Sequence, residues 1–159
     1  MKKKIIWLVI YLTPIFISIA SCSNKVEYSS EVEIPNGIWK SQEAAVFSPE
    51  FADTLQNYNI LLSISNTNLY RYSNLWLFVK IESPDGFYQK DTLEVFLAEE
   101  NGKWLGKEQG DQWKMQFYFK KQIRFPKIGK YTFEIQQGMR DLELTGINKL
   151  AFELIKNND

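Results

Sequence analysis

Apolar and polar residues alternate along most of this chain, in short runs separated by turn residues. The runs are Tyr58–Asn66, Asn74–Ser83, Thr92–Leu97, Trp113–Lys120, Tyr131–Gln136 and Lys149–Ile155. Successive side chains of a β-strand point to opposite faces, so a period of two predicts strands that are buried on one side. Another strand is expected between Ser23 and Gly37, where Tyr28, Val32 and Ile34 are the apolar positions.

Seven or eight short strands at regular spacing predict an all-β sandwich or barrel. Lysines, glutamines and glutamates occupy the second face of three strands, which favours a single antiparallel β-sandwich with a jelly roll as one arrangement. Helix signals are poor: Asp141–Asn148 is the only candidate for a helical turn, and Gly146 weakens it. We expect a signal peptide at 1–21, a lipidated tether and first strand at 22–36, and the sandwich domain at 37–159.

One strand carries large apolar groups on both faces. In Asn74–Ser83, Trp76 and Phe78 lie opposite Leu75 and Leu77. One explanation is that a loop or the N-terminal segment covers the two aromatic residues. The other is an exposed apolar patch, which is typical of a surface that binds a partner.

The N-terminus has the pattern of a bacterial lipoprotein signal. Three lysines precede an apolar run at Ile5–Ile19, and the small residues Ala20 and Ser21 come directly before Cys22. We therefore expect Cys22 to be lipidated, palmitate included, and to hold the protein on a membrane. The alternative, a transmembrane anchor, fits poorly because a spanning helix needs about 20 apolar residues.

The residues after Cys22 bear on localisation. Under the usual sorting rule for lipoproteins, an Asp directly after the cysteine retains the protein on the inner membrane. Ser23 and Asn24 stand there instead, which favours the outer membrane. No acidic run follows, which argues for the periplasmic face rather than the cell surface.

Composition excludes several classes of function. All 19 acidic residues but only 16 of the 19 basic ones lie in Cys22–Asp159, giving a formal net charge of −3 and no basic patch for nucleic acid. The chain has no histidine, which removes histidine-based triads and the usual zinc sites. Cys22 is the only cysteine, so no disulfide forms within one chain. We expect no cofactor and no metal.

Several aromatic and polar residues are candidates for a binding surface. Tyr70, Tyr72 and Asn74 could stack on a sugar, or the tyrosines could pack structurally at a strand end. Trp104, in a loop between glycines, is either a partner anchor or a plug at the open end of the sandwich. Arg140 could clamp a carboxylate, or bridge Asp141 or Asp91 within the fold.

A hydrolase is the weakest class. Its carboxylate pair would have to come from Asp91, Glu94, Asp111, Glu134 or Asp141, and no spacing places two of these across one cleft. Calcium is also poorly supported, because the chain lacks the alternating acidic residues of a calcium loop.

An ordered set of motifs resembles one known family. The set comprises Tyr70-x-Tyr72-Ser73-Asn74-Leu75, Asp91-Thr92, Gly102-Lys103-Trp104-Leu105-Gly106, Gly129-x-Tyr131-x-Phe133, and Met139-Arg140 followed by Leu144-x-Gly146-Ile147. Together with Cys22 it resembles the gliding motility lipoprotein GldH family of the Bacteroidetes, over Cys22 to about Leu154. Lys107-Glu108 departs from the pattern, since a further glycine is expected near Gly106.

The resemblance implies a non-enzymatic outer-membrane lipoprotein needed for gliding and linked to the associated protein secretion machinery. We expect it to act through contacts with other envelope, gliding or secretion proteins. The alternative is a glycan-binding envelope lipoprotein that uses exposed aromatic residues. The predicted interaction surface comprises Tyr70, Tyr72, Trp76, Phe78, Trp104 and Arg140.

Overall fold

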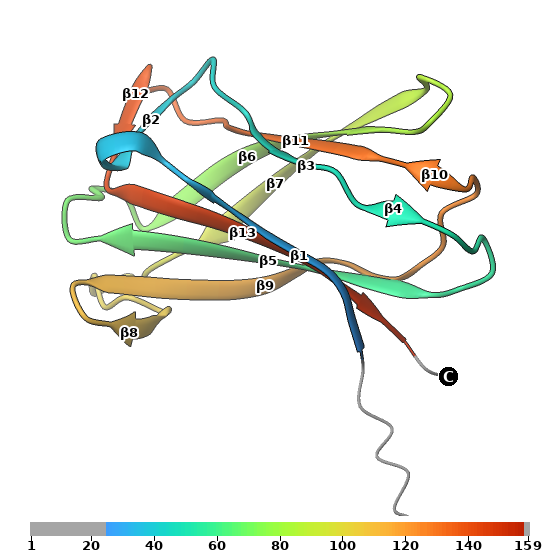
Figure 1. Ribbon diagram of the computed structural model, residues 1–159. Coiled ribbons are helices and arrows are strands. Elements are labelled where there is room, and N and C mark those ends of the chain that lie inside the picture. The colour runs from blue at the N-terminus through green and yellow to red at the C-terminus, as the bar shows by residue number, and fades with distance from the viewer. Residues whose placement is uncertain (1–24, 158–159) are drawn as a thin grey trace, which may run out of the picture.

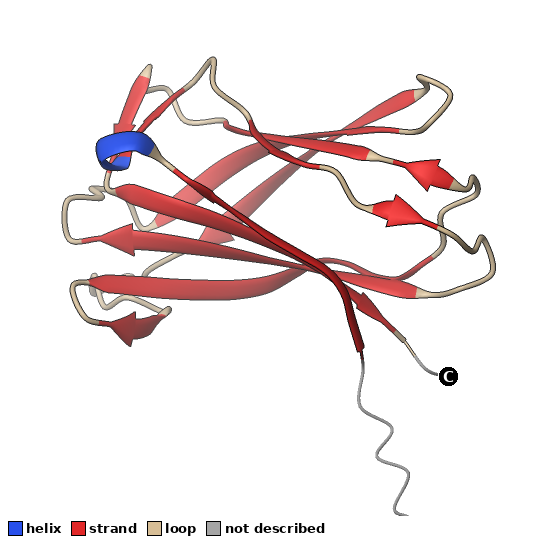
Figure 2. Ribbon diagram, in the orientation of Figure 1, coloured by secondary structure: helices blue, strands red, loops and turns tan. Residues whose placement is uncertain are grey.

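The computed structural model describes residues 25–157, which form a sandwich of two antiparallel sheets (Figure 1). Its elements are β1 (Lys25–Glu33), the 3-10 turn η1 (Pro35–Gly37), β2 (Ile38–Lys40), β3 (Ala45–Phe47), β4 (Glu50–Phe51), β5 (Tyr58–Thr67), β6 (Asn74–Glu82), β7 (Tyr88–Phe96), β8 (Lys107–Gln109), β9 (Gln112–Ile123), β10 (Gly129–Lys130), β11 (Thr132–Gln137), β12 (Glu143–Thr145) and β13 (Ile147–Lys156). Figure 2 shows that η1 is the one helical segment drawn in this part of the chain.

The strand order is that of a jelly roll. One sheet has the order β1-β13-β5-β9-β8, and the other has β3-β11-β6-β7. Eight strands make up the jelly roll, and they can be numbered one to eight in chain order: β1, β3, β5, β6, β7, β9, β11 and β13. In these numbers the first sheet has the order one, eight, three, six, and the second sheet has the order two, seven, four, five. This alternation between sheets places two Greek keys face to face. The predicted all-β sandwich is confirmed.

The core lies between the two sheets and is rich in phenylalanine. Phe152 of β13 stacks on Phe47 of β3, with ring centroids 5.3 Å apart, and packs at a tilt against Phe133 of β11, with centroids 4.9 Å apart. From β6, Leu75 and Leu77 point into the same space and are fully buried. Each large apolar side chain buried here stabilises the fold by about 1.5–3 kcal/mol, and the fold depends on this packing.

Two short strand pairs extend the sandwich. β4 pairs with β10 beyond the β3–β11 pair, and the Tyr131 amide donates to the Pro49 carbonyl at 3.0 Å between them. β2 pairs with β12 and places Leu144 opposite Trp39, and both side chains are 1% exposed.

The one candidate for a helical turn, Asp141–Asn148, contains no helix. The segment forms β12, because Leu144 is buried against Trp39. Gly146 then turns the chain at a φ of +94° into β13. Residues 84–86 lie in the turn between β6 and β7, where the Gly86 amide donates to the Ser83 carbonyl at 2.9 Å.

The first and last described strands lie side by side. Lys25 of β1 pairs with Lys156 of β13, so both described ends leave the same end of the sandwich (Figure 1). The predicted signal peptide at 1–21 and the lipidated Cys22 lie outside the described residues. Within residues 25–157, no helix has the length and hydropathy needed to cross a bilayer.

Candidate functional site

The outer face of the four-stranded sheet exposes large aromatic side chains. On β6, the inward residues from Leu75 to Ile81 are buried, while Trp76 and Phe78 point outward and are 39% and 49% exposed. No loop of residues 25–157 buries the two rings, so the structure favours the exposed patch over the covered face, and the binding of a partner there stays a prediction. Phe96, on the neighbouring strand β7, is 57% exposed. Its position opposite Asn74 places it on the same outer face.

A shallow hollow of about 470 Å³ lies beside these aromatic residues. It is lined by Tyr72, Asn74, Trp76, Phe78, Gly138, Met139 and Arg140. Gly138 leaves room for Phe78, because a β-carbon there would stand 3.1 Å from the phenylalanine ring. The Gly138 amide donates to the Trp76 carbonyl at 2.7 Å, and the Trp76 amide lies 3.4 Å from the Met139 sulfur. The fold thus joins Met139-Arg140 to the tyrosine-rich motif.

Two polar side chains of the hollow are already bonded within the chain. The Tyr72 hydroxyl donates to Asp141 Oδ2 at 2.9 Å, and the Asn74 amide donates to Glu94 Oε1 at 2.5 Å. The remaining lining is mainly apolar, which suits a partner with apolar side chains.

Arg140 is the cation at the rim of the hollow. It is exposed and makes no ion pair with any residue between 25 and 157. The predicted bridge to Asp141 or Asp91 is wrong, since Tyr72 binds Asp141 and Lys120 binds Asp91 at 2.5 Å. Its guanidinium is consequently available to a partner's carboxylate.

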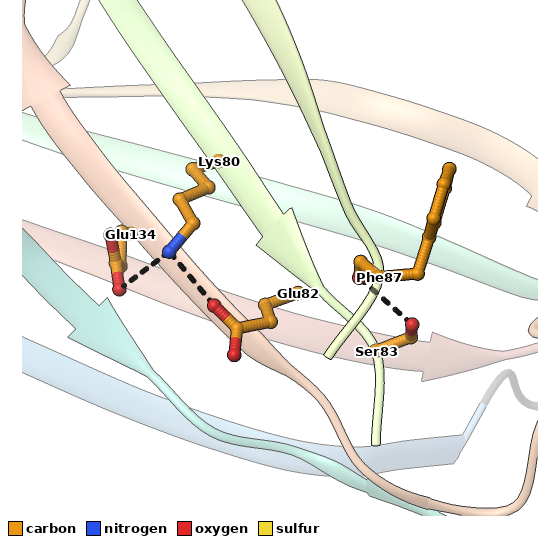
Figure 3. Close-up of polar contacts among 5 residues, drawn as sticks. All are labelled: Lys80, Glu82, Ser83, Phe87 and Glu134. Carbon is orange, nitrogen blue, oxygen red and sulfur yellow. Dashed lines mark hydrogen bonds and ion pairs between the residues drawn. The ribbon is translucent and has the colours of Figure 1, made fainter. Parts of the chain in front are cut away.

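The apolar face ends in an ionic cluster. Lys80 Nζ lies 2.8 Å from Glu82 Oε2 and 3.5 Å from Glu134 Oε1. Figure 3 shows the Lys80 side chain between the two glutamates. The hydrogen bond to Glu82 and the charges of both glutamates raise the pKa of Lys80. In the same view, the Ser83 hydroxyl donates to the Phe87 carbonyl and fixes the hairpin between β6 and β7 (Figure 3).

Tyr70 does not belong to the exposed surface, so its inclusion there is wrong. Its side chain is 3% exposed, and its hydroxyl donates to the Asn74 carbonyl at 2.6 Å. Burial, and secondarily the neighbouring Tyr72 and Asp141, raise its pKa well above 10. This is the structural role that a tyrosine at a strand end commonly takes.

Trp104 is half-buried and closes one end of the sandwich. Its ring lies 5.8 Å from Trp113 and 6.4 Å from Tyr70, and its Nε1 donates to Asn68 Oδ1 at 3.0 Å. These contacts favour the plug over the partner anchor. Of the predicted interaction surface, the hollow brings together Tyr72, Trp76, Phe78 and Arg140.

The predicted interaction surface left out three contributors: Gly138, Met139 and Phe96. A signal for Phe96 was present, because Leu93, Val95 and Leu97 alternate inward and leave Phe96 on the face of Trp76. Gly138 and Met139 join the hollow only through the pairing of β11 with β6.

Four of the five carboxylates considered for hydrolysis are not free side chains. Asp91, Glu94, Glu134 and Asp141 are bound to four different partners: Lys120, Asn74, Lys80 and Tyr72. Nor do residues 25–157 gather three acidic side chains in a group suited to a metal ion. The arrangement offers no support for a hydrolase.

Comparison with known proteins gives one consistent result. The profile of the GldH lipoprotein family matches residues 26–154. The gliding motility lipoprotein GldH homolog of Christiangramia forsetii is 33% identical over 147 residues, covering 88% of this chain and 90% of that protein. The gliding motility lipoprotein GldH of Flavobacterium johnsoniae is 30% identical over 141 residues, covering 84% and 87%.

Among solved structures, the infectious bursal disease virus VP2 subviral particle is similar at a TM-score of 0.35 and 12% identity. The match covers 83% of this chain and 34% of the VP2 chain. Nothing further follows from so low a score.

Proposed function

We propose that this chain, which belongs to the GldH lipoprotein family, is an outer-membrane lipoprotein held by Cys22 and facing the periplasm. Its work there is to bind other proteins of the gliding and associated secretion machinery. It performs no catalysis in this proposal. The family membership supports the gliding role, and the sequence around Cys22 supports the membrane and the face.

The exposure of Trp76 and Phe78 is the observation that carries this proposal. A sandwich normally turns polar residues outward from both sheets. Here two large aromatic residues stand on the outer face of β6, in the lining of a hollow that Arg140 also lines. Aromatic residues and arginine are the side chains that most often dominate protein interfaces. We therefore place the partner on this face.

A glycan is the second candidate ligand. The hollow is concave and sets the rings of Tyr72 and Trp76 beside the Asn74 amide, as a sugar site would. However, the Asn74 amide and the Tyr72 hydroxyl are already bonded to Glu94 and Asp141. A sugar would have to displace or share these bonds, whereas an apolar protein surface would not, so we favour protein.

Site-specific photo-crosslinking in living cells tests the proposal. A benzoylphenylalanine is placed at position 78 of the full-length lipoprotein, and a matched one at Leu55, which is 74% exposed in the loop between β4 and β5 and does not line the hollow. We expect the residue-78 probe, and not the residue-55 probe, to capture one discrete envelope protein. With the residue-78 probe in place, Trp76→Ser should lose that adduct. The double variant Trp76→Ser/Phe78→Ser, which carries no probe, should lose gliding or secretion while the protein stays folded and membrane-bound.

Two outcomes would count against the proposal. One is a folded, normally localised double variant with undiminished gliding and secretion. The other is equal adducts from positions 55 and 78. If Trp76→Ser loses binding to cell-envelope polysaccharide but keeps the residue-78 protein adduct, the glycan candidate is supported instead.

A further inference from the structure

Strand β7 is an open edge of the four-stranded sheet. It runs for nine residues and pairs with β6 on one side. No strand among residues 25–157 pairs with its other side. The Ser83 amide donates to the Phe87 carbonyl and the Leu97 amide to the Ser73 carbonyl, so odd-numbered residues bond toward β6. Bonding alternates along antiparallel strands, which turns the backbone groups of residues 88, 90, 92, 94 and 96 outward. Such a row is a template for another strand.

The outward residues of β7 form a self-complementary series about its midpoint, Thr92. In an antiparallel pairing of β7 with itself, Thr92 meets Thr92, Lys90 meets Glu94, and Tyr88 meets Phe96. Every pair on the outer face is then matched: a basic residue with an acidic one, and an aromatic residue with an aromatic one. We propose that a second copy of this chain binds here, joining the two four-stranded sheets edge to edge around a two-fold axis at Thr92.

The charges support a second copy as the occupant. Neither Lys90 nor Glu94 makes an ion pair with another described residue. Within its own sheet Lys90 lies opposite Lys80, whose charge is already matched by Glu82 and Glu134. Like charges directly opposite are unfavourable in a sheet, and opposite charges are favourable. The second copy would supply a Glu94 to each Lys90.

The aromatic pair points the same way. Tyr88 and Phe96 are 54% and 57% exposed at the two ends of β7. In the pairing each ring gains the other as a cross-strand neighbour, which stabilises a sheet by about 0.2–1 kcal/mol per pair. In the single chain the Thr92 amide donates to Asp91 Oδ1 at 3.0 Å, and the Thr92 carbonyl of the second copy would take over that bond.

The symmetry is compatible with a membrane anchor on each copy. The two-fold axis is perpendicular to the joined eight-stranded sheet, because it relates two antiparallel edge strands. The five-stranded sheets of both copies therefore lie on the same side of that joined sheet. Strand β1 belongs to that sheet in each copy. The aromatic faces with Trp76 and Phe78 then form one continuous surface on the opposite side.

Disulfide capture in native membranes tests this dimer with the full-length lipoprotein. Cys22 is the only natural cysteine, so Thr92→Cys adds one thiol at the proposed axis. Facing residues in a hydrogen-bonded antiparallel pair have α-carbons about 5.5 Å apart, which a disulfide can span. With copper phenanthroline as the oxidant we expect a covalent dimer of Thr92→Cys, and none from Asn101→Cys, an exposed loop position.

Charge reversal in the Thr92→Cys background is the sharper measurement. Lys90→Glu and Glu94→Lys should each lower the dimer yield about tenfold or more, because each creates two like-charge pairs. The double variant Lys90→Glu/Glu94→Lys should restore it, since the opposite charges are again paired. Dimer yield from Thr92→Cys no higher than from Asn101→Cys would overturn the proposal. So would a double variant as impaired as the single ones.

Discussion

Gly146 lies directly against the backbone of Tyr70. A β-carbon on Gly146 would stand 2.2 Å from the Tyr70 nitrogen and 2.7 Å from its α-carbon. The Gly146 amide also donates to the Gly37 carbonyl at 2.8 Å, and its own carbonyl accepts from the Thr67 amide at 2.9 Å. One glycine thus fastens the turn between β12 and β13 to the segment that leads into β6 and the candidate face.

Replacing Gly146 by Ala should therefore destabilise the protein strongly. The methyl group would strike backbone that cannot move without breaking these hydrogen bonds, and the φ of +94° is itself unfavourable for alanine. We expect a loss of roughly 3 kcal/mol or more in the free energy of unfolding, measured by denaturant titration. The control is Gly86→Ala, where φ is +82° but nothing lies within 4 Å, and about 1 kcal/mol is expected. Equal losses at both positions would contradict the close approach.

Tyr70 should make stability fall at alkaline pH. Burial raises the pKa of its hydroxyl above the ordinary value of 10.0, so the folded state holds the proton more tightly than the unfolded state. Its contribution is therefore fully present below pH 10 and is lost as the pH rises further. Tyr58, whose pKa is also raised by burial, adds to the same trend.

Tyr70→Phe separates this effect from general alkaline damage. The variant should be less stable at neutral pH by about 1–2 kcal/mol, because the Asn74 carbonyl loses its donor. Its Tm should fall less steeply above pH 10 than that of the natural chain. Tyr118→Phe, at a position 45% exposed, serves as the control and should change neither quantity appreciably. An unchanged alkaline slope in Tyr70→Phe would refute the assignment.

Two tryptophans should respond in opposite ways to the same substitution. Trp104→Ala removes the contacts with Trp113, Tyr70 and Asn68, and should cost about 2–3 kcal/mol of stability. Trp76→Ala, on the open face, should cost less than about 1 kcal/mol while reducing partner capture. Thermal unfolding followed by circular dichroism measures the first effect, and the residue-78 crosslink measures the second. A stable Trp104→Ala that loses the adduct would return Trp104 to the binding surface.

Cys22→Ala should release the protein from membranes without unfolding the sandwich. Each buried methylene of an acyl chain contributes about 0.8 kcal/mol to membrane binding, so removing the acylated thiol removes most of the attachment. Fractionation of cells should find the variant outside the outer-membrane pellet, with its Tm unchanged. A variant that still pellets with the outer membrane would show that another contact holds it there.

The alternation of apolar and polar residues was sufficient to predict the fold class. The predicted strands Asn74–Ser83 and Tyr131–Gln136 lie within one residue of the observed limits of β6 and β11. The reason is that successive side chains of a strand point to opposite faces, a local rule that can be followed in the sequence. Short strands escaped this reasoning. β12 is not predicted by local periodicity, because its order comes from pairing with β2 and from the burial of Leu144.

For the candidate site, the sequence by itself determined which residue types were present: an extra aromatic pair on β6, a lipidation signal, and no histidine. Only the tertiary structure decided that Trp76 and Phe78 are open, that Tyr70 is buried, and that Met139 and Arg140 lie beside them. The physical reason is that exposure depends on which segments pack against a face, and those segments are distant in the chain: Trp76 and Met139 are 63 residues apart, and Tyr72 and Asp141 are 69 apart. Side-chain alternation fixes the two faces of a strand, but the jelly-roll crossings between sheets determine what covers each face.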